Sequence, residues 1–207
     1  MHQRTTAPIL RVPISAKASA VTVTSIDPKT ALIVIDLQQG IVVLPTVNPI
    51  ADVVKHARAL ADAFRRRGLP VVLVNVAGGA PGRTERPPRN SVPFPAGWTD
   101  LIPELNQQPA DIVVTKRTWG AFASTDLEDQ LKALDVTQVV IVGVATGTGV
   151  EATARQAYEH GFNVTLGTDA MTDIRPAAHD YSLAHVFPRL GETGTAQEII
   201  DLLERSA

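Results

Sequence analysis

The 207-residue sequence contains no cysteine. This absence excludes disulfides, thiolate ligands for a metal, and any mechanism that begins with attack by a cysteine. No apolar run approaches the roughly 18 residues that a membrane-spanning helix requires. The N-terminus also lacks a basic region followed by a hydrophobic one, as a secretion signal would have. We therefore expect a soluble, cytoplasmic protein with no membrane partner.

The chain also lacks a surplus of either charge. It has 19 Lys and Arg against 21 Asp and Glu, which gives a formal net charge of -2. Without a basic surplus to neutralise a phosphate backbone, nucleic acid is not an expected partner. The basic run Arg65, Arg66 and Arg67 ends a predicted helix, where cations interact favourably with the helix dipole.

Short β-branched runs alternate with longer amphipathic segments, a pattern typical of parallel strands covered by helices. The predicted strands are 31–36, 70–76, 111–116, 138–144 and 163–169, and the predicted helices are 49–67, 125–134, 149–160, 176–187 and 195–205. The sequence thus predicts one α/β domain. We expect a three-layer sandwich with a central, mostly parallel sheet of five or six strands flanked by helices.

Two segments interrupt this alternation. Residues 1–29 form a Thr, Pro and Ser-rich arm, with one candidate edge strand at 20–26, and such arms often contact a neighbouring subunit. The predicted domain therefore covers residues 30–207. The segment 77–99 is rich in Pro and Gly and too long for a simple connection, which favours a functional lid.

Ligands of open parallel sheets bind at the carboxyl ends of the strands. Asp36, Lys116 and Asp169 close the first, third and fifth predicted strands, Asn75 lies near the end of the second, and a glycine-rich turn follows the fourth. An acid, a base and a turn are thus expected at one edge of the sheet.

The turn itself permits a dinucleotide interpretation, because Gly147, Gly149 and Ala152 have the G-x-G-x-x-A spacing and Asp169 follows about 20 residues later. Three facts oppose it. Three strands precede the motif, only one follows it, and Gly143 to Thr146 separate it from the strand core. A second interpretation uses the backbone N–H groups of a helix that begins near Gly149, which suit an anion or oxyanion.

Three segments together resemble the isochorismatase-like hydrolases: TALIVIDLQ (30–38), VTKRTWGAFASTDLEDQL (114–131) and VVIVGVATGTGVEATARQAYEHGFNVTLGTDAMTD (139–173). The resemblance runs from about residue 28 to 200 and implies a Rossmann-like α/β fold. It implies that Asp36 and Lys116 are catalytic, and that Ala145, Thr148 and Gly149 of the turn contact the substrate. It also implies a non-proline cis peptide bond between Val144 and Ala145.

The sequence departs from the family pattern where a cysteine usually begins the helix after the fourth strand, since Gly149 stands there. Amidase members attack a carbonyl with that cysteine. Isochorismatases instead hydrolyse a vinyl ether without a covalent intermediate, with the Asp as acid. In that mechanism Asp36 must carry a proton, which burial favours and a nearby Lys opposes.

We therefore expect a small-molecule hydrolase acting on an isochorismate-like enol ether. Two alternatives stay open: amide or imide hydrolysis by a cysteine-independent route, and a catalytically silent member that binds a metabolite or serves as a scaffold. Thr146 or Thr148 as a nucleophile would need a base, and no histidine is close in sequence. Hydrogen bonding within the turn or helix capping explains these threonines better.

The remaining candidates concern ligands and partners. Arg83 and Arg86 in the long loop are candidate partners for a substrate carboxylate, with surface solvation as the equal alternative. Trp98, Trp119 and Phe122 are candidate walls of an apolar pocket, although core packing explains aromatic residues equally well. No histidine lies in the segment after the second strand, so we expect no metal and no cofactor. We expect a homo-oligomer.

Overall fold

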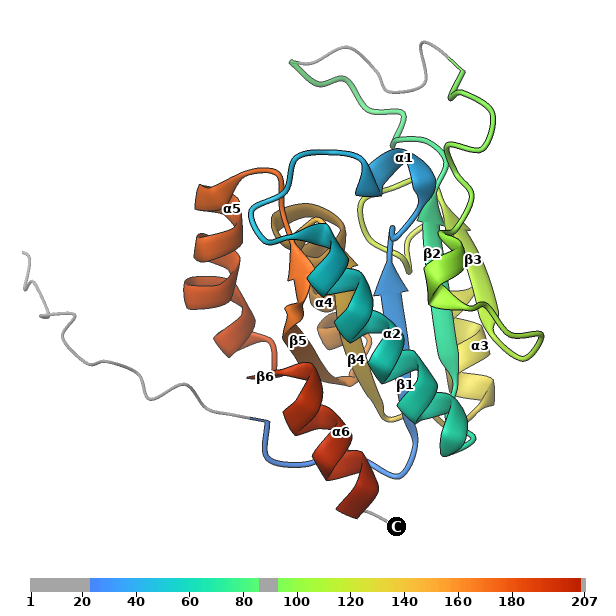
Figure 1. The fold of residues 1–207 in the computed structure, drawn as a ribbon, viewed down its shortest axis with the longest axis vertical. Coiled ribbons are helices and arrows are strands. Elements are labelled where there is room, and N and C mark those ends of the chain that lie inside the picture. Colours follow the sequence, from blue (N-terminus) through green and yellow to red (C-terminus); the bar gives the residue numbers. More distant parts are fainter. Residues whose placement is uncertain (1–22, 86–92, 206–207) are drawn as a thin grey trace, which may run out of the picture.

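The computed structural model describes residues 23–85 and 93–205, and it has a single six-stranded sheet at its centre (Figure 1). The strand order is β3-β2-β1-β4-β5-β6, and every neighbouring pair is parallel. The strands are β1 (Thr30–Ile35), β2 (Val71–Val76), β3 (Ile112–Lys116), β4 (Gln138–Val144), β5 (Asn163–Thr172) and β6 (Glu192–Gly194). The predicted α/β sandwich is confirmed.

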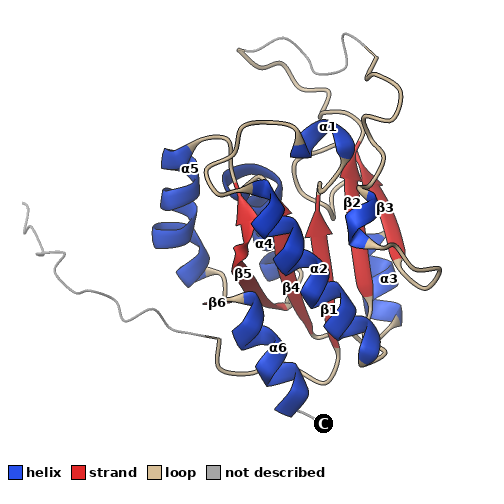
Figure 2. Ribbon diagram, in the orientation of Figure 1, coloured by secondary structure: helices blue, strands red, loops and turns tan. Residues whose placement is uncertain are grey.

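Helices connect the strands and form the outer layers (Figure 2). The α-helices are α1 (Gln39–Val42), α2 (Ile50–Arg66), α3 (Leu127–Ala133), α4 (Glu151–Glu159), α5 (Pro176–Tyr181) and α6 (Ala196–Arg205). Shorter turns of helix are the 3-10 segments η2 (Pro103–Leu105) and η5 (Phe187–Arg189) and the π segments η3 (Thr146–Val150) and η4 (Ser182–Val186).

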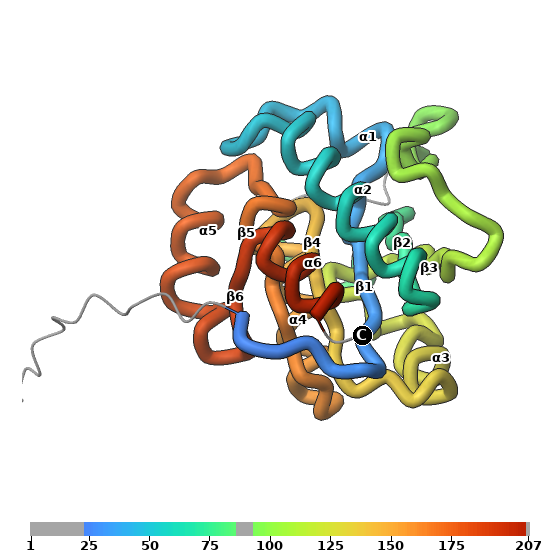
Figure 3. Tube along the Cα trace, turned by 60° about the horizontal axis from the view of Figure 1, so that its bottom comes forward, coloured from blue at the N-terminus to red at the C-terminus, as the bar shows by residue number. Residues whose placement is uncertain are grey.

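Two apolar clusters separate the layers. Leu32 and Val34 of β1 face the cluster that contains the buried residues of α2 and α6, whereas Ile33 and Ile35 face the cluster of α3 and α4. Figure 3 shows α3 and α4 on the side of the sheet away from α2. Because both sheet faces are covered, all six residues of β1 are buried, as expected for a central parallel strand.

The fifth strand is longer than predicted. Its pairing with β4 shifts between Ile141 and Gly143, so β5 bulges and continues to Thr172. Asp169 therefore lies inside the strand, where its Oδ1 accepts a hydrogen bond of 2.7 Å from the backbone N–H of Ala196 at the start of α6. The expectation that Asp169 closes the strand at the carboxyl edge is wrong, and Asp173 takes that place.

The C-terminal helices show one match and one difference. Thr195 and Glu198 form the predicted capping box, with the Glu198 N–H donating to Thr195 Oγ1 and the Thr195 N–H donating to Glu198 Oε2. The predicted helix 176–187 instead divides into α5, η4 and η5. Pro188 lies in η5 and contributes to this division, because it has no N–H to donate to a continuing α-helix.

The described part of the N-terminal arm lies against its own chain. Residues 23–26 form no strand, but the Val23 N–H donates to Thr193 O and Thr24 contacts Glu192 on β6. Residues 1–22 of the arm and the beginning of the predicted edge strand lie outside the described residues. No helix in the described ranges is both long and apolar enough to cross a bilayer. Cytoplasmic location and homo-oligomer formation stay predictions.

Candidate functional site

Asp36 and Lys116 meet at the carboxyl edge of the sheet. Asp36 directly follows β1 and Lys116 ends β3, with β2 between the two strands. Lys116 Nζ lies 2.7 Å from Asp36 Oδ2, and the two residues are only 1% and 5% exposed. The structure thus brings together the two side chains that the sequence assigned to catalysis, as a buried ion pair.

The backbone of Asp36 has an uncommon conformation. Its φ is 52°, in the left-handed region that residues with a side chain rarely adopt. The Asp36 N–H donates to Val74 O at 2.9 Å, so β2 helps to hold this conformation. A left-handed residue at a strand end turns its side chain out of the regular alternation, and such strain is frequent at functional sites.

The turn after β4 lies beside this pair. Gly143 has a φ of 115°, and a β-carbon there would collide with the carbonyl oxygen of Ile35, so this close contact between β4 and β1 requires glycine. The Val144–Ala145 peptide bond is cis, as the family resemblance implied. A β-carbon on Gly149 would lie 3.3 Å from Asp36 Oδ2 and 3.0 Å from Ile35 Cγ2. The position without a side chain therefore faces the Asp36 carboxylate directly.

Asp173 holds the turn from the β5 side. The side chain of Asp173 is fully buried, and its two oxygens accept hydrogen bonds from the backbone N–H groups of Gly147, at 2.8 Å, and Arg175, at 2.9 Å. The Arg175 guanidinium then reaches over the turn, where Nη2 donates to Thr148 Oγ1 at 2.9 Å. Neither Asp173 nor Arg175 was predicted from the sequence, because the predicted fifth strand ended at Asp169.

A buried histidine contacts the turn, although none is close to it in sequence. His179 on α5 is 6% exposed, and its Nδ1 lies 2.8 Å from Thr146 Oγ1. Its Nε2 lies 3.4 Å from Nδ2 of Asn48. The histidine reaches the turn through the fold, because α5 lies back over η3 and brings His179 to Thr146 across 33 residues of sequence.

The direction of these hydrogen bonds nevertheless opposes a nucleophilic Thr146. Asn48 Nδ2 also donates to Met171 O at 3.3 Å, which fixes the amide with its nitrogen toward His179. The Nε2 atom of His179 must then accept, so Nδ1 carries the proton and donates to Thr146 Oγ1. A histidine in this tautomer cannot take a proton from the Thr146 hydroxyl through Nδ1, and Thr146 is fully buried.

Helix α4 fixes the segment that follows Lys116. Thr153 Oγ1 donates to Gly149 O at 2.7 Å and accepts from the Ala121 N–H at 3.1 Å. Gln156 Oε1 accepts from the Phe122 N–H at 3.1 Å. Because one helix binds both the turn and the loop after β3, the positions of Lys116 and Gly149 are coupled.

The other predicted residues are less closely placed. Trp119 is 65% exposed, whereas Phe122 is buried and its ring lies 5.9 Å from that of Phe162, which assigns Phe122 to the core. Trp98 stacks on Phe94, with centroids 4.1 Å apart, and lines a surface depression whose lining does not include Asp36 or Lys116. Arg83 is exposed, and Arg86 lies outside the described residues.

Within the two described ranges, no three His, Asp or Glu side chains gather in a way that would hold a metal ion. Fold and site together define an α/β protein in which a buried Asp–Lys pair at the carboxyl edge faces a glycine at the start of a helix. Because that glycine offers no side chain, the Asp–Lys pair is suited to proton transfer and charge stabilisation.

Comparisons with known proteins agree with this class. The family model "Isochorismatase domain" matches residues 30–198. The uncharacterized isochorismatase family protein YwoC of Bacillus subtilis is 40% identical over 179 residues, 84% of this chain and 93% of that protein. Streptothricin hydrolase of Streptomyces noursei is 33% identical over 170 residues, 82% of this chain and 64% of that protein.

A solved structure of an isochorismatase family protein from Burkholderia thailandensis matches with a TM-score of 0.82 and 42% identity. The match covers 87% of this chain and 98% of that one. The chain therefore belongs to the isochorismatase family and is a hydrolase of that family.

Proposed function

We propose that the protein hydrolyses a small anionic enol ether of the isochorismate type by acid catalysis from Asp36. The observation that carries this proposal is the place of Gly149, where a β-carbon would lie 3.3 Å from Asp36 Oδ2. The carboxylate faces backbone at the position where amidase relatives would present a cysteine. A mechanism without a covalent enzyme intermediate fits this arrangement.

The reaction then needs one proton donor and one water. Asp36 donates its proton to the terminal vinyl carbon, and the ether carbon becomes an oxocarbenium ion. Water adds to that carbon and returns a proton to the Asp36 carboxylate. The hemiketal then collapses: its bond from the central carbon to the original ether oxygen breaks, and the proton of its hydroxyl group passes to that oxygen. The products are an alcohol and a ketone, which is pyruvate in the case of isochorismate.

Asp36 must therefore be protonated when the substrate is bound. In the free protein the Lys116 ammonium at 2.7 Å favours the carboxylate form. A substrate carboxylate near Lys116 would share this cation and place a second negative charge beside Asp36, and both effects favour the protonated acid. The pair thus suits anionic enol ethers better than neutral ones.

The test is pyruvate release from isochorismate, run in D2O without added metal. We expect one deuterium in the methyl group of the product, because the proton reaches carbon from an exchangeable acid. Asp36→Asn should abolish release while circular dichroism shows an intact fold. Asp52→Asn, an exposed acid on α2, is the matched control and should leave the rate unchanged. No turnover of isochorismate or related enol ethers would contradict the proposal.

Amide or imide hydrolysis is tested separately, because streptothricin hydrolase is among the relatives. The wild-type protein should leave small amides and imides intact. Gly149→Cys introduces the single thiol of the chain, and its β-carbon fits if Ile35 and Asp36 shift by a few tenths of an ångström. Rapid alkylation of that thiol with new amidase activity would identify a former cysteine site. Amide hydrolysis by the wild type would favour the cysteine-independent route. No activity on enol ethers, amides or imides would favour a catalytically silent protein that binds a metabolite or serves as a scaffold.

A further inference from the structure

Arg175 places a cation on the rim of the glycine turn. Its side chain is 55% exposed, and Nη2 donates to Thr148 Oγ1 at 2.9 Å. Thr148 directly precedes Gly149, the residue that faces Asp36. The guanidinium therefore contacts the residue next to the glycine that faces the Asp36 carboxylate.

The backbone under this side chain is firmly held. Asp173 is buried and binds the N–H groups of both Gly147 and Arg175, so one carboxylate fixes the turn and the origin of the arginine side chain together. The guanidinium Nε stays 3.5 Å from Asp173 Oδ1, and no residue within 23–85 or 93–205 accepts a hydrogen bond from Nη1. A positioned guanidinium with an open N–H edge suits a carboxylate.

The sheet order puts two cations on opposite sides of the site. Lys116 ends β3, Asp36 follows β1, the turn follows β4, and Arg175 follows β5. We propose that Arg175 binds a carboxylate of the substrate on the β5 side of the scissile bond, and so selects small carboxylic acids. This inference rests on the proposed function and names its substrate class. Arg83, the candidate from sequence, has no comparable fixed position in the described structure.

A binding experiment tests the anchor without requiring turnover. Benzoate and benzamide have nearly the same shape and differ in charge, so their affinities for the wild type, measured by ligand-observed NMR, report on charge recognition. We expect benzoate to bind more tightly than benzamide, and Arg175→Gln to weaken benzoate by about 10-fold or more while leaving benzamide unchanged.

Arg155→Gln is the matched control. Arg155 on α4 is 51% exposed and bonds Glu151, so it resembles Arg175 in exposure and in having an acidic neighbour, but it lies away from the turn. This variant should bind both probes as the wild type does. Equal weakening of benzoate and benzamide by Arg175→Gln would mean a purely structural arginine and overturn the proposal. Benzoate affinity that does not change, or a wild type without preference for benzoate, would also overturn it.

Turnover separates this inference from the proposed function. If isochorismate is hydrolysed, Arg175→Gln should raise KM about 10-fold or more and change kcat little, because a carboxylate contact that is equal in the ground state and the transition state contributes uniform binding. If no enol ether is hydrolysed, the proposed function fails while a benzoate preference that depends on Arg175 still supports the anchor. A loss confined to kcat would contradict it.

Discussion

The protein contains two close acid–base pairs, one buried and one partly buried, that look alike in isolation and differ in their surroundings. Lys116 and Asp36 lie 2.7 Å apart with side chains 2% and 8% exposed. Arg65 and Asp111 lie 2.6 Å apart with side chains 14% and 2% exposed. Neither distance nor burial tells which pair performs chemistry.

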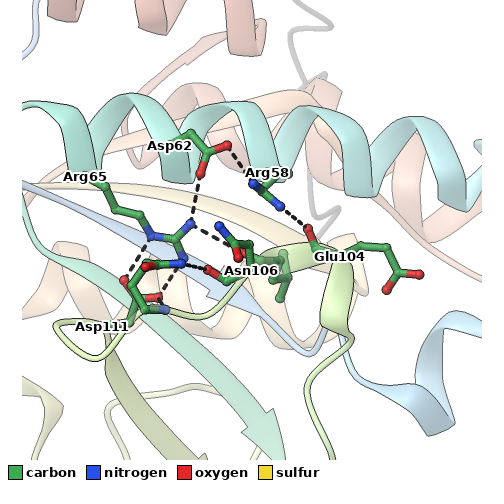
Figure 4. A network of polar contacts seen from close by, with 8 residues as sticks. Arg58, Asp62, Arg65, Glu104, Asn106 and Asp111 are labelled. Atoms are coloured by element: carbon green, nitrogen blue, oxygen red, sulfur yellow. Dashed lines mark hydrogen bonds and ion pairs between the residues drawn. The ribbon is translucent and has the colours of Figure 1, made fainter.

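The neighbours of Arg65 supply the distinction (Figure 4). Its guanidinium binds both oxygens of Asp111, one oxygen of Asp62 and the carbonyl of Leu105. Burial alone would lower the pKa of Arg65, but the hydrogen bonds and negative charges of Asp111 and Asp62 outweigh it and raise the pKa above its ordinary value. The network ties α2 to the segment after η2, and this is a structural role beyond the helix-dipole effect expected from the sequence.

The pair at the sheet edge has a different setting. Besides Asp36, the Lys116 ammonium has a distant contact of 3.4 Å to Thr118 O. Asp36 has a left-handed backbone and faces the missing side chain of Gly149. A network of fixed partners stabilises one protonation state, whereas a pair at a strand end beside a turn can exchange a partner for a substrate. Location, more than burial, thus indicates function.

Breaking the edge pair should have the largest effect. Lys116→Met removes the cation paired with Asp36, which in the proposed mechanism also binds the substrate carboxylate, so we expect isochorismate turnover to fall by about 10²- to 10⁴-fold. The double variant Asp36→Asn, Lys116→Met leaves no unpaired charge and should unfold at about the same denaturant concentration as the wild type. Turnover that persists in the folded single variant would remove Lys116 from the mechanism.

Breaking the Arg65–Asp111 pair should lower stability and leave activity unchanged. Asp111→Ala leaves the partly buried Arg65 charge with Asp62 as its remaining anionic partner, and we expect the free energy of unfolding to fall by about 2–4 kcal/mol. Guanidinium titration measures this loss, and activity per folded molecule should stay unchanged. Arg58 pairs with Asp62 through a half-exposed contact, so Arg58→Ala is the control and should cost about 0–1 kcal/mol. Similar losses in both variants would show that the network carries no special stability.

The third comparison is between Thr146 as a support of the turn and Thr146 as a nucleophile. Thr146→Val leaves the His179 Nδ1–H without its acceptor, so we expect a loss of about 1–3 kcal/mol in the free energy of unfolding. Thr146→Ser keeps the hydroxyl and should recover most of this stability. Both folded variants should retain turnover. Abolished turnover in the valine variant at unchanged stability would restore the nucleophile hypothesis.

The sequence predicted the parts of the molecule that depend on local pattern. Apolar runs and glycine stops located the five longer strands, and the family motifs singled out Asp36 and Lys116. The predictions failed where distant segments decide. The bulge extends β5, so that Asp173 and not Asp169 lies at the carboxyl edge of the sheet. Helix α5 folds back over the turn and brings His179 to Thr146. Contacts across such sequence separations leave no periodic signal.

An exposed ion pair completes the comparison and should have the smallest effect. Glu128 on α3 bonds Lys132, and His160 lies 3.1 Å from the same carboxylate. The hydrogen bond from Lys132 lowers the pKa of Glu128 below its ordinary value. Desolvation opposes this shift, whereas the charges of His160 and Lys132 and the hydrogen bond from His160 lower the pKa further. A carboxyl whose pKa is lower in the folded state contributes stability above its unfolded pKa, and this contribution disappears as pH falls through the folded pKa.

Glu128→Gln should therefore lower Tm slightly at neutral pH, and the difference from wild type should vanish in acid. Solvent screens the pair, so the change at neutral pH should stay far below that of Asp111→Ala. A Tm difference that grew on acidification would reverse the sign of this linkage and contradict the assignment of Glu128 as the stabilised anion.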